Sequence, residues 1–84
     1  MPGNAIHECP AWAVHQLSRS VWFWAAWQSG ANAATPHAPR RFGTCLSRAN
    51  ARVAAQQAAG PEAREVAEAA AAQAYAALKA TGKM

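Results

Sequence analysis

The sequence contains no aspartate and has few large apolar side chains outside one short segment. Eight Lys and Arg residues oppose four Glu residues, which gives the 84-residue chain a formal net charge of +4. Only ten residues are Leu, Ile, Val or Phe, whereas 25 are Ala. That share of large side chains is well below the roughly 20% under which a packed core becomes doubtful. We therefore expect residues 1–84 to form a single small helical domain of marginal stability.

The residue patterns that catalytic and cofactor sites need are also missing. The five glycines are dispersed and form no phosphate-binding loop, and no nucleophile-elbow or triad context is visible. Metal-ligating residue types occur in the segment His7–Cys9 and at His15, His37 and Cys45. They include neither a close pair of cysteines nor two histidines at i, i+4, which are the spacings that zinc sites normally use. We expect no enzyme, no cofactor, no metal site and no small-molecule substrate.

Two cysteines are too few for a disulfide framework. In an oxidising compartment one bond between Cys9 and Cys45 would add ~3 to 4 kcal/mol, which is large for so thin a core. Two free thiols in a cytoplasmic protein are the favoured interpretation, and a secreted protein is the alternative.

The most concentrated feature that is present is the apolar run Val21–Trp27, which holds three of the four tryptophans. With Pro10 suited to a first helical turn and Gly30 to a stop, the pattern predicts a tryptophan-rich helix over about 11–28, apolar on nearly all sides. Buried tryptophans dominate interface energetics, so this segment is the expected anchor for a partner. The predicted partner-binding residues are Trp22, Phe23, Trp24 and Trp27.

Two membrane-related alternatives apply to the same segment. A transmembrane helix needs ~20 apolar residues, and this run is far shorter. A secretory signal peptide fits better, because Arg19 precedes the run and Ala31 and Ala33 form an Ala-x-Ala cleavage pattern, although Glu8 is out of place in a basic leader. Residues 1–33 would then be an address segment of a secreted or membrane-surface peptide.

The rest of the chain predicts a helical hairpin. Residues 29–43 contain Pro and Gly without periodicity and indicate a flexible linker. A helix is expected over about 44–59 with Thr44 as N-cap, followed by a boundary at Gly60 and a second helix over about 61–80. The second helix has a 4-3-4-3 alanine seam that suits close approach of the first helix or of a second copy. The seam consists of Ala63, Ala67, Ala70, Ala74 and Ala77.

Four arginines, Arg40, Arg41, Arg48 and Arg52, lie in a stretch without acidic residues. Arginine matches phosphate geometry, so nucleic-acid binding is one alternative, and a solvated face that keeps the chain soluble is the other. A helix-turn-helix reader is rejected, because carboxylates open the second helix of the hairpin and would face phosphates.

Together these patterns predict an all-α protein of two or three short helices. The predicted function is a non-catalytic protein–protein interaction or accessory role, with a protein partner or a homo-oligomer. The alternatives are a small basic nucleic-acid-binding accessory protein, a secreted or membrane-surface peptide, and a chain without selected function, since GC-rich DNA yields a similar composition in almost any frame.

Overall fold

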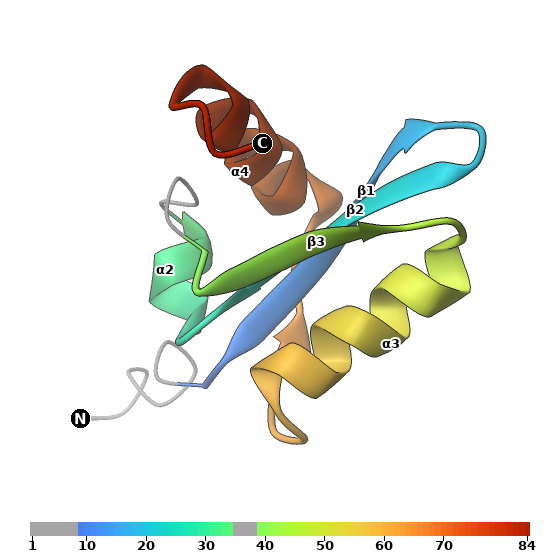
Figure 1. Ribbon diagram of the computed structural model, residues 1–84. Helices are drawn as coiled ribbons and strands as arrows, with labels where there is room; N and C mark the ends of the chain where they lie inside the picture. Colours follow the sequence, from blue (N-terminus) through green and yellow to red (C-terminus); the bar gives the residue numbers. More distant parts are fainter. Residues whose placement is uncertain (1–8, 35–38) are drawn as a thin grey trace.

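The computed structural model describes residues 9–34 and 39–84, which fold as a four-stranded mixed sheet with a long helix on each face (Figure 1). The prediction of an all-α fold is therefore wrong. The elements run in the order β1 (Ala11–Ser18), β2 (Val21–Trp27), α2 (Gly30–Ala34), β3 (Arg41–Cys45), α3 (Arg48–Ala59), β4 (Arg64–Glu65) and α4 (Glu68–Ala80).

The sheet has the strand order β3-β2-β1-β4. β1 and β2 form an antiparallel hairpin, β3 pairs antiparallel with β2, and β4 pairs parallel with β1. The parallel pair is short: the backbone N–H of Arg64 donates to the carbonyl of Pro10 at 3.0 Å, and that of Val66 donates to Trp12 at 2.9 Å. α3 thus connects one edge strand to the other across the sheet.

The tryptophan-rich segment forms the central hairpin of this sheet and not the predicted helix over 11–28. Successive side chains of a strand point to opposite faces, and here a helix covers each face, so both sets of side chains can be apolar. A strand that is covered on both faces shows no alternation of polar and apolar residues. Its sequence therefore resembles that of a helix that is apolar on all sides. Its tryptophans, Phe23 and Val21 favour strand structure.

One core cluster lies between the sheet and α4, with α2 beside it. Phe23 is at its centre and is fully buried, with its ring 5.4 Å from that of Tyr75 in an edge-to-face arrangement and 6.4 Å from that of Phe42. Trp27 is also buried here. Its Nε1 has no hydrogen-bond partner among the described residues. α4 contributes mainly small side chains to this cluster, and its buried residues are Ala71, Ala74 and Leu78.

The second core cluster lies between the opposite face of the sheet and α3. Trp12 and Val14 from β1 meet Ala51 and Ala55, both fully buried on the helix. Alanines at these positions let the helix axis approach the sheet closely enough to contact the large indole. The guanidinium of Arg52 lies 5.4 Å from the centre of the Trp12 ring, which adds a cation–π contact at the border of the cluster.

The predicted helical hairpin is also wrong, although α3 lies within 44–59 and α4 lies within 61–80. The two helices cover opposite faces of the sheet, with β4 between them in sequence (Figure 1). Their alanines pack on strands and not on each other. The N-cap of α3 is Ser47, whose Oγ accepts from the N–H of Asn50 at 3.1 Å, and Gly60 ends the helix at φ 100°.

The remaining stretches differ from prediction as well. The segment expected to be a flexible linker, 29–43, contains α2 and the start of β3. Of the predicted alanine seam, Ala74 is buried, whereas Ala67 is exposed, because the buried stripe of α4 runs through Ala71 and Leu78.

Cys9 and Cys45 lie at opposite ends of the sheet. Cys45 is level with Trp22 and Ala11 is level with Trp27, so Cys45 and Ala11 are separated by roughly 16 Å along the strands. Cys9 precedes Ala11 by two residues, which leaves the two cysteines far beyond disulfide reach. In the described part of the chain, no helix has the length and apolar character needed to cross a membrane.

Candidate interaction surface

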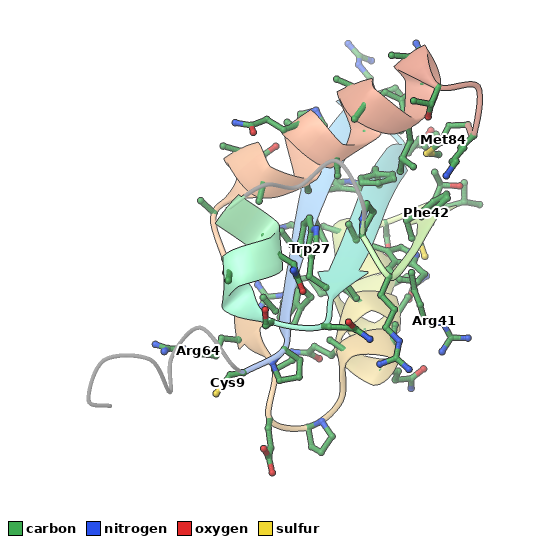
Figure 2. All side chains as sticks on the ribbon, turned by 90° about the vertical axis from the view of Figure 1, so that its left-hand side faces the viewer. Cys9, Trp27, Arg41, Phe42, Arg64 and Met84 are labelled. Carbon is green, nitrogen blue, oxygen red and sulfur yellow. The ribbon has the colours of Figure 1, made fainter. Side chains whose placement is uncertain are left out.

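Two of the four predicted anchor residues are part of the core. Phe23 and Trp27 are 0% and 1% exposed, and Figure 2 shows Trp27 enclosed beside α2. A partner cannot touch either side chain without opening the fold. Trp22 and Trp24 lie on the α3 face and are only half-buried. The accessible part of the tryptophan segment is therefore confined to this side of β2.

The indole of Trp24 extends over the neighbouring strand at Gly43, its register partner on β3. A Cβ on Gly43 would lie 3.0 Å from the indole Nε1 and 3.1 Å from Cε2 and Cζ2. Any side chain at this position would push the ring away, so glycine is the residue that lets the indole lie flat against β3. Sequence reasoning missed Gly43, although an isolated glycine near apolar residues is a signal for close approach.

The outer edge of β3 is open. Within residues 9–34 and 39–84, β3 is paired through β2 alone and no strand lies on its other side. Alternate N–H and C=O groups of an edge strand point away from the sheet and can bond to an added strand. Proteins usually protect such edges by keeping them short or with charged side chains, Pro or a bulge. The five-residue strand β3, Arg-Phe-Gly-Thr-Cys, carries one exposed charge at its first residue, Arg41, and has no Lys, Pro or bulge, since its register with β2 is regular.

Beside this edge, an open groove of about 600 Å³ lies between β3 and α3. Its walls combine the half-buried indole of Trp24 with the small side chains Ala54 and Ala58, and its rim carries polar and charged groups. The rim and remaining lining residues are Arg40, Arg41, Phe42 and Gln57. In Figure 2, Arg41 lies at the outer side of the sheet. The groove thus offers an apolar floor and two positive charges next to unpaired strand backbone.

The structure divides the four predicted arginines into two pairs. Arg52 approaches Glu65 at 3.4 Å on the β4 side of α3. The pKa of Glu68 is lowered first by its hydrogen bond with His15 and last by the charge of Arg48. Arg40 and Arg41 lie on the β3 side, and neither forms an ion pair within the described residues. Of the first pair, Arg52 thus has a carboxylate partner, and Arg48 lies within electrostatic range of another carboxylate. The four arginines do not form one basic face.

Two large apolar side chains of the described residues are strongly exposed. Leu46 is 77% exposed in the turn that follows β3, and Val53 is 50% exposed on α3. They are the most exposed large hydrophobic residues of the described chain. Exposed apolar residues that are scattered singly are normal on a protein surface, and neither of these two lines the groove beside β3.

The closest polar side-chain contact lies on the other face and joins β1 to α4. Nδ1 of His15 hydrogen-bonds Oε2 of Glu68 at 2.8 Å. This bond, supported by a backbone hydrogen bond from Gln16, holds the pKa of Glu68 below its ordinary value. Both side chains are partly exposed, at 29% and 59%. The pair anchors the first turn of α4 and lies in no described groove.

The residue types that could ligate a metal are not brought together in the described chain. No group of three His, Cys or Glu side chains occurs within residues 9–34 and 39–84. His7, Glu8 and His37 lie outside these residues.

Comparisons with protein-family models, with curated proteins and with solved structures find no match to this chain. The surface around β3 is thus interpreted from its own geometry.

Proposed function

We propose that this chain is a non-catalytic protein-interaction module that binds its partner at the outer edge of β3. The observation that carries the proposal is the half-buried indole of Trp24 lying over Gly43, on a strand whose outer side is unpaired in the described part of the chain. The binding residues of this proposal are Trp24, Arg40, Arg41 and Phe42. Phe23 and Trp27 are assigned to the core.

Strand addition explains how such a surface gains both affinity and specificity. Backbone hydrogen bonds to the open edge of β3 hold an extended segment, and alternate side chains of that segment fall on the two faces of the sheet. On one face they meet the groove between Trp24 and α3. On the other face they meet Phe42, which is half-buried against Phe23. The hydrogen bonds to β3 use only backbone groups and do not depend on the partner's sequence. The side-chain contacts with the groove and with Phe42 therefore determine which partner sequence binds.

The nucleic-acid alternative receives less support from the same geometry. Single-stranded RNA and DNA bind to sheets through exposed aromatic platforms, and here α3 and α4 cover both faces. Within residues 9–34 and 39–84, the groove is lined by two cations without an ion pair, Arg40 and Arg41. Two phosphate contacts give a log-log salt slope of at most about −1.8 on duplex DNA, a weak footprint.

Site-specific photo-cross-linking in cells tests the proposal. A photoreactive phenylalanine replaces Thr44, which is exposed on β3, and in a control chain it replaces Gln73, which is exposed on α4. We expect a discrete covalent adduct from position 44 and none from position 73. Equal adducts from both positions, or none from either, would contradict an interaction surface at β3.

A charge substitution adds a second arm. Thr44→Lys introduces a protective edge lysine, and Gln73→Lys adds the same charge away from the edge. In chains carrying a photoreactive residue at Gln57 on the groove rim, Thr44→Lys should abolish the adduct and Gln73→Lys should leave it intact. An adduct that survives Thr44→Lys places the contact outside the edge.

A further inference from the structure

We infer that the strand added to β3 is β3 of a second copy, so that two chains form a continuous eight-stranded sheet around a two-fold axis at Gly43. This inference rests on the proposed function, because it names the occupant of the same edge. Two-fold pairing uses one self-complementary patch on both copies, and an antiparallel strand pair has this symmetry.

The register of such a pair follows from Gly43. If each Gly43 faces its counterpart, Arg41 of one chain is opposite Cys45 of the other, and Phe42 is opposite Thr44. A two-fold axis through the middle of the five-residue strand uses the whole length of β3. Any register shifted from Gly43 would leave part of the open edge unpaired on both chains.

The α3 face at the axis has room for the two indoles. Trp24 already lies over Gly43 in each chain, and facing strands are only ~5 Å apart. The two indoles therefore come together above the axis, where aromatic rings attract at centroid distances of roughly 4.5–7 Å. A foreign strand with a side chain opposite Gly43 on this face would project against the indole. Glycine opposite glycine avoids that collision.

The other face at the axis carries Phe42 and Thr44 from each chain. α4 packs mainly on β1 and β2, so the β3 part of this face is less covered. In the proposed register the two Phe42 side chains are diagonal neighbours at roughly 7–8 Å, within reach of aromatic rings, and each lies opposite a Thr44. The large side chains thus alternate with small ones across the axis.

The charges of the edge also permit self-pairing. Arg41 of one chain is four residues along the ladder from Arg41 of the other, roughly 14 Å, which exceeds the ~8 Å screening length at physiological salt. No acidic residue lies on β3. Arg40 and Arg41 of one chain lie at one end of the new ladder, and Arg40 and Arg41 of the other chain lie at the opposite end. At the same ends, the exposed side chain of Leu46 is brought beside the aliphatic stem of Arg41.

Sedimentation equilibrium of the purified full-length chain at moderate salt tests the inference directly. We expect a concentration-dependent change from the mass of one chain to twice that mass, without larger species. Thr44→Lys, which places a lysine opposite Phe42 twice in each dimer, should weaken dimerisation by at least roughly tenfold. The control Gln73→Lys, with an equal change in charge, should dimerise like the wild type.

The outcomes separate this inference from the proposed function. A wild-type chain that stays monomeric up to ~1 mM, where weak association still registers, overturns the second copy. Dimers that are insensitive to Thr44→Lys, or assemblies of more than two chains, also overturn the inference. A monomer whose position 44 still cross-links to a different protein keeps the proposed function and refutes only self-pairing. A monomer without any adduct from position 44 removes both.

Discussion

Gly43→Ala is the most incisive perturbation of the surface between β2 and β3. The new methyl carbon would lie 3.0 Å from Nε1 of Trp24 and 3.1 Å from two further ring atoms, closer than ordinary van der Waals contact. The φ angle of Gly43 is not positive, so alanine brings no backbone strain. The cost is therefore displacement of a large indole from a packed position. Overpacking of this kind destabilises by roughly 1–3 kcal/mol.

Thermal unfolding followed by circular dichroism measures this cost. In a domain of this size, 1 kcal/mol shifts Tm by roughly 4–8 °C, so Gly43→Ala should melt visibly earlier. In a Trp24→Val background the ring is gone, and the same substitution should be neutral or slightly stabilising, because alanine loses less backbone freedom than glycine. The double-mutant cycle isolates the contact. An equal cost in both backgrounds would refute the argument that the indole demands glycine.

Three further predictions concern other parts of the molecule. Ala55→Leu should lower stability by roughly 1–3 kcal/mol in thermal melts because Ala55 is fully buried between α3 and the sheet, whereas the same change at exposed Ala49 should stay within about 0.5 kcal/mol. Glu68→Gln should lower Tm at neutral pH, and the difference from wild type should vanish as pH falls through the lowered folded pKa of Glu68; a pH-independent difference would contradict stabilisation by the hydrogen bond between the Glu68 carboxylate and His15. Replacing Arg40 and Arg41 with Gln should leave the salt slope of any DNA binding unchanged, and a slope that flattens by about 1.8 in a titration, as loss of two phosphate contacts requires, would revive the nucleic-acid alternative.

The helices were the predictable part of the fold, because their signals are local. High alanine content and the glycine after Ala59 predicted helices that contain α3 and α4. Their placement was not predictable from the same signals. An alanine stripe indicates close approach but does not say whether the partner is a helix or a sheet, and only the strands formed by residues 11–27 decide that question.

The hairpin of β1 and β2 was missed for a physical reason. Alternation identifies a strand only when one face is wet, and both faces of β2 are covered by helices. The available signals were composition, with tryptophan, Phe23 and Val21 in a short run, and the Ser-Arg-Ser turn at 18–20. Long-range pairing with β3 and β4 carries no local signature, so the core position of Phe23 and Trp27 followed only from the structure.

The proposed surface shows the same division between local and tertiary signals. Arg40 and Arg41 stood out in the sequence because charge runs are visible, and Trp24 stood out because tryptophan is rare. Their separation from Arg48 and Arg52 depends on which side of α3 each residue occupies, which is a tertiary fact. The role of Gly43 depends on the register between β2 and β3. Residue types in the sequence identified the candidate binding residues, and the strand pairing in the structure showed which of them lie together.

Residue-resolved amide hydrogen exchange by NMR, in dilute and concentrated samples, tests the central claim that β3 is an open edge which receives a strand. The account predicts strong protection of β1 and β2 at every concentration. Alternate amides of β3 should exchange rapidly when the protein is dilute and become protected as the second copy binds. Protection of residues 11–28 in a continuous helical pattern would contradict the fold, and outward β3 amides that exchange equally fast at every concentration, with no partner that slows them, would contradict the function built on it.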